Sequence, residues 1–252
     1  MRKDLQVSMD DATNHGSLLP VTYFVDNSYG EVLGMGGYPC YTSTLIKRFS
    51  QYIMQPAYYE AFGEIQNKYW SMLDDAVTNT GSPFRIPVFI CAHQNEVDGR
   101  IVVLRKSDRA NNLLQFHTDL RSPKVDILKK NRNASLVFYD KEEKIQLRVK
   151  VECEVNNQNS ATEESWKKTQ HISRRCYLTD SPPGTTSENP TSGMISELED
   201  FDYTMEQSED GYKNFTVIKC KIKSIEWLYL AAKGHRRAKF DLENKKENWL
   251  VP

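Results

Sequence analysis

Five short β-type runs fall within about seventy residues in the middle of this sequence. Turn signals, VDG at 97–99 and DRANN at 108–112, lie between them, and one helix-like stretch at 122–131 interrupts the series. A βαβ fold needs a helix after almost every strand, so this pattern predicts a meandering antiparallel barrel. The five runs cover residues 86–93, 100–106, 113–118, 134–139 and 144–155.

Helical and loop segments flank the β runs. Before them, apolar residues recur at spacings of three and four, which predicts an amphipathic helix whose buried face carries Phe62, Ile65, Tyr69, Met72 and Ala76. After them we expect a second helix at 161–177, a Pro- and Ser-rich loop at 179–195, and two more β runs at 215–222 and 224–231. The expected fold is therefore mainly β with flanking helices (α+β).

The chain divides by composition into three parts. Residues 1–56 are expected to form an N-terminal extension, partly disordered because its first twenty residues are polar and without periodicity. Its MGGY stretch lacks the spacing of a phosphate loop, and the extension has no assigned role. Residues 57–245 would form the barrel domain, and 246–252 a C-terminal tail.

Charge and cysteine usage exclude several classes of function. The formal net charge of the 252 residues is -1, so no global field attracts nucleic acid or an anionic membrane. No apolar run has transmembrane length, and the N-terminus lacks the apolar core of a signal peptide. Five scattered cysteines with no CxxC pair argue against zinc and disulfides, and no histidines have metal-ligand spacing. We expect a cytoplasmic protein without a metal site.

Two arginines bound the run RIVVLR. Arg100 and Arg105 are five residues apart, so on a regular strand their side chains point to opposite faces. A bulge or a strand end would be needed to bring both to one ligand. By itself the run also fits an edge strand with solvated charges.

The segment HTDLRSPK, residues 117–124, leads from a β run into a helix. Ser122 is a plausible N-cap, and Pro123 suits the first helical position. The amides of that helix end, the hydroxyls of Thr118 and Ser122 and the charge of Lys124 together predict a phosphate cradle. The alternative is a capped helix with a surface lysine.

Gln146 and Trp227 are the third feature. An amide and an indole suit the polar edge and the apolar face of a flavin ring, and the basic segment GHRRAKF follows Trp227 at 234–240. A glutamine and a tryptophan on strands are, however, usually packing residues.

Taken in order and spacing, these segments resemble the pyridoxamine 5'-phosphate oxidase family, over roughly residues 57–240. The resemblance implies a split β-barrel that binds flavin mononucleotide (FMN) and forms a homodimer, with the flavin held between the subunits. It implies phosphate- and ribityl-contacting positions for Arg100, Arg105, Thr118, Ser122 and Lys124. Gln146 and Trp227 would lie at the ring, and Lys239 stands at the position of a family arginine.

The sequence also departs from the family pattern. His117 stands where bacterial members often have Tyr, Arg105 where they often have Lys, and Pro123 where they have an Arg that clamps the FMN phosphate. The family's Tyr-x-x-x-Arg-x-x-x-Ser clamp for the substrate phosphate is missing between 156 and 180. The remaining candidates for such a clamp are Arg174, Arg175, His235, Arg236 and Arg237, of which Arg236 and Arg237 are the substrate candidates nearest the expected flavin site.

Three functions remain open. The first is an FMN-dependent oxidase that acts on a small amine or alcohol and passes electrons to oxygen. The second is a flavin or F420-like reductase on the same fold, and the third is a split barrel that binds a ligand without catalysis.

Overall fold

The computed structural model describes residues 24–25, 32–33, 57–194, 203–232 and 234–252. The chain forms two compact units, Met1–Gln55 and Pro56–Pro252. In the first unit, β1 (Phe24–Val25) pairs antiparallel with β2 (Val32–Leu33). The rest of the predicted N-terminal extension lies outside the described residues.

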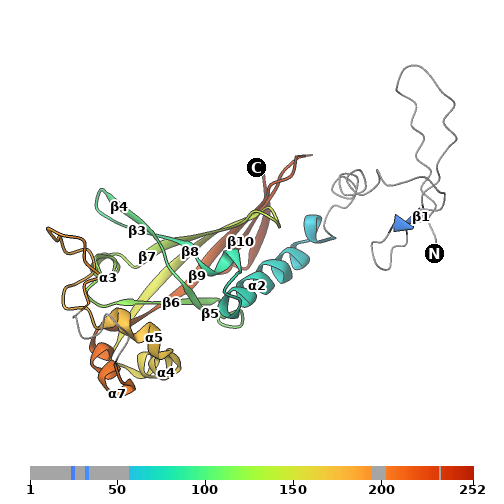
Figure 1. The fold of residues 1–252 in the computed structure, drawn as a ribbon. Coiled ribbons are helices and arrows are strands. Elements are labelled where there is room, and N and C mark those ends of the chain that lie inside the picture. Colours follow the sequence, from blue (N-terminus) through green and yellow to red (C-terminus); the bar gives the residue numbers. More distant parts are fainter. Residues whose placement is uncertain (1–23, 26–31, 34–56, 195–202, 233) are drawn as a thin grey trace. The chain divides into compact units, whose positions relative to one another are not determined.

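One nine-stranded antiparallel sheet dominates the second unit (Figure 1), as the β runs predict. Seven strands follow the order β11-β10-β9-β8-β7-β3-β4, while β6 pairs with β5 and with β9. Strand β9 therefore lies between β8 and β10 over one half and between β8 and β6 over the other. The strands are β3 (Val88–His93), β4 (Glu96–Ile101), β5 (Leu104–Asp108), β6 (Leu113–Asp119), β7 (Asn133–Asp140), β8 (Ile145–Asn157), β9 (Phe215–Tyr229), β10 (Arg236–Asp241) and β11 (Lys246–Leu250).

The main core lies between the inner face of this sheet and helix α2 (Phe62–Thr78). Cross-strand partners such as Leu136, Val149 and Ile225 alternate inward along β7, β8 and β9, as period-2 patterning requires. The helix was predicted from its apolar spacing, but its buried face is shifted slightly. Phe62 and Met72 are only partly buried, and the buried residues are Ile65, Tyr69, Trp70, Leu73 and Ala76.

The predicted helix at 161–177 is wrong in one respect: the chain breaks it into α4 (Ser160–Lys168), α5 (His171–Arg174) and the 3-10 turn η3 (Arg175–Tyr177). The Arg174 side chain reaches back across this break. Its guanidinium donates to the carbonyl of Trp166 at 2.9 Å, which also accepts the N–H of Thr169, and to the carbonyl of Thr169 at 3.2 Å.

Two further expectations are corrected at the C-terminal end. The β runs 215–222 and 224–231 form a single strand, β9, with an irregularity opposite Lys150 and Val151. The expected tail 246–252 is not separate from the domain, because Lys246–Leu250 form β11 on the free edge of β10. Trp249 also stacks on Phe62, with ring centroids 4.6 Å apart, which fixes this strand to the start of α2.

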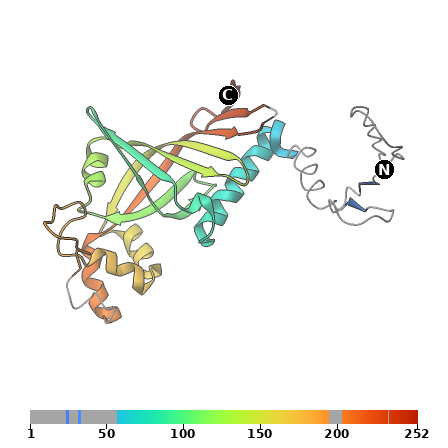
Figure 2. The same ribbon diagram turned by 45° about the horizontal axis from the view of Figure 1, so that its top comes forward.

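Short helices gather at the end of the sheet opposite β10 and β11 (Figures 1 and 2). They cover the outer face of β9 with a second apolar cluster of Trp166, Tyr177, Phe215 and Val217. Within the described residues, no helix is long and apolar enough to cross a membrane. The remaining short elements are η1 (Ala57–Glu60), η2 (Pro83–Arg85), α3 (Pro123–Lys130), α7 (Met205–Ser208) and η4 (Glu209–Asn214).

Candidate functional site

Thr118, Ser122 and Lys124 meet where β6 ends and α3 begins. The Lys124 ammonium donates to Thr118 Oγ1 and to Ser122 Oγ, both at 2.7 Å. Ser122 occupies the N-cap position in an extended backbone conformation, yet its hydroxyl caps no amide and serves Lys124 instead. The three residues are 8%, 4% and 8% exposed, so the lysine is no surface residue. We call these three residues the cradle.

The cradle holds a buried positive charge that forms no ion pair with a carboxylate of the described residues. Among the ion pairs of the described residues, none includes Lys124. Burial and the nearby Arg100 lower the pKa of Lys124 to about 8, while Cys91 and Asp119 oppose that shift. A buried cation held by two hydroxyls and close to another cation favours binding of an anion. The cradle therefore fits the phosphate of a nucleotide cofactor.

The run RIVVLR is not one strand, which changes the geometry of its two arginines. Arg100 is the last residue but one of β4, is paired in register with inward-facing Phe89 and forms an ion pair with Asp98. Arg105 lies on β5 at a register shift between Leu104 and Lys106. A strand end and an irregularity therefore lie between the two arginines. Arg100 is close enough to Lys124 to lower its pKa, whereas Arg105 acts on His117.

His117 faces away from the cradle, because it is the neighbour of Thr118 on β6. Its Nε2 lies 3.3 Å from Nε2 of Gln115, and its ring meets Phe215 edge-on with centroids 4.8 Å apart. Burial and the positive charge of Arg105 lower the pKa of His117 to about 4. The imidazole is therefore neutral at neutral pH and is suited to hydrogen bonding rather than to charge pairing.

Gln146 and Trp227 lie on opposite faces of the sheet within one chain. Trp227 is 0% exposed and faces the main core opposite Leu147 and Ala238. Gln146 lies on the other face, where its cross-strand partner on β9 is Leu228. Sequence reasoning missed Leu228, although alternation along IEWLYL places it on the face that Trp227 does not share.

The basic segment is strand β10 and does not form a loose cluster of cations. Arg237 and Lys239 share the outer face with Gln146, while Ala238 and Phe240 face the core. Arg237 and Arg148 both pair with Glu226, and Arg236 lies over the ring of Tyr59 at 4.7 Å. An open groove of about 560 Å³ borders this strand and is lined by Glu60, His235, Arg236, Arg237, Trp249, Leu250, Val251 and Pro252.

Arg174 is also committed to the fold. It is 5% exposed, lies 4.5 Å from the centre of the Trp166 ring and pairs with Glu209. It also donates to backbone carbonyls and to Ser208. These bonds use four of its five donors, so the fold already occupies most of this guanidinium.

The predicted site residues fall into two groups at opposite ends of β9. Thr118 pairs in register with Thr216, and Gln146 with Leu228. Twelve residues of β9 separate these two partners, which corresponds to about 40 Å of extended strand. Within one chain, the cradle and the Gln146 face therefore do not surround the same small molecule.

Comparison with known proteins shows what the domain resembles. Residues 66–157 match the family described as Pyridoxamine 5'-phosphate oxidase, FMN-binding domain. This segment, less than half of the chain, is therefore similar to the FMN-binding domain of that family. The match includes Arg100, Arg105, the cradle, His117 and Gln146, and it ends before Trp227, Arg236, Arg237 and Lys239.

Solved structures support the same pyridoxamine 5'-phosphate oxidase-like fold. A pyridoxamine 5'-phosphate oxidase-related FMN-binding protein from Nostoc punctiforme PCC 73102 is 17% identical, with a TM-score of 0.58 over 79% of this chain and 100% of that one. PhzG from Burkholderia lata 383, solved with tetrahydrophenazine-1-carboxylic acid, is 12% identical. Its TM-score is 0.55 over 79% of this chain and 98% of that one. At these identities the likeness concerns the split-barrel fold alone.

One curated relative is similar over a short stretch. An uncharacterized oxidoreductase from Shewanella frigidimarina is 45% identical over 51 residues, which are 20% of this chain and 18% of the relative. The chain thus matches less than a fifth of the length of that relative.

Proposed function

We propose that this chain is an FMN-dependent oxidoreductase that oxidises a small amine or alcohol with oxygen as the final acceptor. The observation that carries the proposal is the buried Lys124 ammonium, which two hydroxyls hold in a domain of an FMN-binding family. FMN, when bound, supplies a two-electron acceptor, and the protein contributes position and electrostatics.

In this proposal the cradle binds the FMN phosphate. Lys124 supplies the charge, Thr118 and Ser122 supply hydroxyl donors, and Arg100 adds positive potential behind them. Arg105 and neutral His117 lie on the other side of β6, where they would contact the less charged part of the cofactor. A phosphate dianion would restore the charge balance that the cradle lacks in the free protein.

We further propose a homodimer in which FMN lies between two subunits. The separation of about 40 Å along β9 means that a cradle and a Gln146 face can share one cofactor when they come from different chains. An outer sheet face supports this arrangement, because it exposes Val88, Val97, Ile101 and Tyr139 along the paired strands β3, β4 and β7. Exposed apolar residues gathered in this way mark an interaction surface.

At the ring, Gln146 and Leu228 of the partner subunit replace the pair that the sequence suggested. Leu228 offers an apolar surface beside the Gln146 amide, and Lys239 lies one cross-strand row away on the same face. Lysine gives a point charge where a family arginine would give a planar fork, so it can stabilise negative charge but not bind two atoms at once.

One absorption spectrum and one titration test the cofactor. Purified protein should show flavin absorption, and the stripped protein should bind FMN more tightly than riboflavin, which lacks the phosphate. Oxygen consumption with added amines or alcohols then tests the reaction. A colourless or Soret-absorbing preparation would instead favour a non-catalytic split barrel, and reduction by a nicotinamide or deazaflavin donor would favour a reductase.

A further inference from the structure

The loop that follows η3 is fastened next to the cradle. Residues 179–185, here called the strap, lie beside the first turn of α3 in both views (Figures 1 and 2). A Cβ at Gly184, whose φ is +93°, would lie 3.9 Å from Cγ of Pro123, the first residue of that helix. The strap thus forms a wall at the helix end that carries Ser122 and Lys124.

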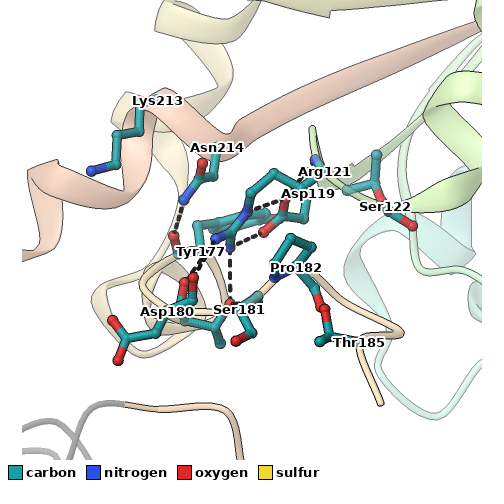
Figure 3. A network of polar contacts seen from close by, with 12 residues as sticks. Asp119, Arg121, Ser122, Tyr177, Asp180, Ser181, Pro182, Thr185, Lys213 and Asn214 are labelled. Carbon is teal, nitrogen blue, oxygen red and sulfur yellow. Dashed lines mark hydrogen bonds and ion pairs between the residues drawn. The ribbon is translucent and has the colours of Figure 1, made fainter.

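Arg121 makes the connection (Figure 3). Its Nη1 donates to the carbonyls of Thr179 at 2.9 Å and Asp180 at 3.3 Å, and its Nη2 donates to the Thr179 hydroxyl at 2.9 Å. The same guanidinium forms a fork with Asp119, through Nε at 3.0 Å and Nη2 at 2.8 Å. These bonds use all five of its donors, so Arg121 has none left for a ligand.

Asp119 organises the turn that places the cradle. Its carboxylate accepts the backbone N–H of Arg121 at 2.7 Å, and its carbonyl accepts that of Ser122 at 3.1 Å. Asp119 is 6% exposed and close enough to Lys124 to raise the pKa of that lysine. An unpaired carboxylate at this place would repel a phosphate. The two hydrogen bonds from Arg121 neutralise the Asp119 carboxylate and so remove this repulsion.

We propose that Arg121 is a positioning residue for the FMN phosphate: it neutralises Asp119 and ties the strap across the end of α3. The inference rests on the proposed FMN site and names a residue that acts there without touching the cofactor. Removing Arg121 both frees the strap and leaves a negative charge beside the cradle. These two effects can be separated by experiment.

The decisive measurement compares FMN and riboflavin affinities of the full chain. We expect Arg121→Met to weaken FMN binding roughly tenfold, because the Asp119 charge is then unopposed beside the phosphate, and riboflavin binding less than twofold. Adding Asp119→Asn to that variant should recover most of the FMN affinity, because the repelling charge is gone. Asparagine keeps a side-chain oxygen for the backbone N–H of residue 121, so the turn is retained. A purely structural role would not produce this rescue.

The matched control is Arg132→Met, which removes an arginine just after α3 that donates to Cys153 O and pairs with Glu152. It should leave the preference for FMN unchanged. Thr179→Val changes the strap less than Arg121→Met does, because it removes one hydroxyl and keeps the Arg121–Asp119 hydrogen bonds. Both Thr179→Val and Arg121→Met should speed cleavage after the exposed Glu188 by a glutamate-specific protease.

The outcomes separate this inference from the proposed function. If the wild-type chain binds riboflavin as tightly as FMN, the proposed phosphate site fails, and the role of Arg121 fails with it. If the wild type prefers FMN and Arg121→Met keeps that preference, or Asp119→Asn restores nothing, the positioning role alone is overturned. Unchanged cleavage at Glu188 in both variants would show that Arg121 does not hold the strap in place.

Discussion

At the scale of single residues, Lys124 shows how a binding group can work against the stability of its own fold. It is 8% exposed, bonded to two hydroxyls, and has no carboxylate partner among the described ion pairs. Burying such a charge costs free energy that a bound anion would return. The sequence left two roles open for Lys124, as part of a phosphate cradle or as a surface lysine. The two roles differ in how deeply the side chain is buried, and the local spacing of residues does not encode burial.

Lys124→Ala should weaken FMN binding by about 1.5–3 kcal/mol, the range for a hydrogen bond to a charged group, and leave riboflavin binding almost unchanged. Titrations followed by flavin fluorescence measure both affinities. The melting temperature of the apoprotein should hold or rise, because a buried charge is removed. Equal losses for the two flavins would show that Lys124 does not contact the phosphate.

The pH dependence of FMN affinity should follow the same lysine. Its folded-state pKa of about 8 lies below the ordinary value for lysine, so the unfolded chain binds more protons between the two values. Apoprotein stability should therefore rise as the pH increases from about 8 toward about 10.4. FMN affinity should fall over that range, since the phosphate needs the ammonium form. Calorimetry in buffers of different ionisation enthalpy should detect proton uptake on binding near pH 9, and Lys124→Ala should abolish it.

At the scale of elements, the β runs were predictable because alternation and turn residues are local signals. The helix 161–177 was not, since the side chain of Arg174 reaches back across the break to the carbonyls of Trp166 and Thr169, a contact that local spacing does not indicate. The face of Trp227 could be read from alternation only once the register with β8 was known. The residues of the cradle and of the Gln146 face were predicted from the sequence. Their separation along β9 was not, because it depends on pairing between segments about a hundred residues apart, such as Thr118 with Thr216.

Arg174→Met should destabilise the short helices at that end of the sheet by about 2–3 kcal/mol, because several buried acceptors lose a charged donor. Chemical denaturation gives the change in the free energy of unfolding. Lys168→Met, which removes a solvent-exposed pair with Glu164, is the control and should change stability by less than about 1 kcal/mol. FMN affinity should be nearly constant, and a selective loss of substrate turnover at unchanged stability would instead place Arg174 at the substrate.

At the scale of the whole molecule, the outer face of the sheet is the proposed dimer interface, and it also carries the Gln146 face. Strands β3, β4 and β7 expose apolar side chains there, while β8, β9 and β10 present the Arg148–Glu226–Arg237 ion pairs. A twofold dimer through this face would cover its apolar part.

Ile101→Asp should raise the dimer dissociation constant by at least about tenfold, because it buries an unpaired charge at the proposed interface. Light scattering at micromolar concentration measures the mass, and FMN binding should weaken together with dimerisation. Ile172→Asp replaces a similarly exposed residue on α5 and should change neither the dimer dissociation constant nor FMN binding. A monomer that still binds FMN tightly would contradict the shared site.

Turnover of pyridoxamine 5'-phosphate should be weak or absent. Arg174 and Arg237, two candidates for a rebuilt phosphate clamp, already pair with Glu209 and Glu226. Two missing charged contacts at about 1.5–3 kcal/mol each correspond to roughly two to four decades in catalytic efficiency. Peroxide release from FMN-loaded protein is the assay, and turnover near about 1 per second would refute this expectation.

The position of β9 in the sheet also bears on how the chain is made. In the described part of the chain, β6 pairs only with β5 and β9, whereas β4, β3, β7 and β8 form a separate series. Until residues 215–229 leave the ribosome, a nascent chain therefore holds two unconnected pieces of sheet with open edges. Closure of the sheet has to wait for β9, and until then those edges are open to neighbouring chains.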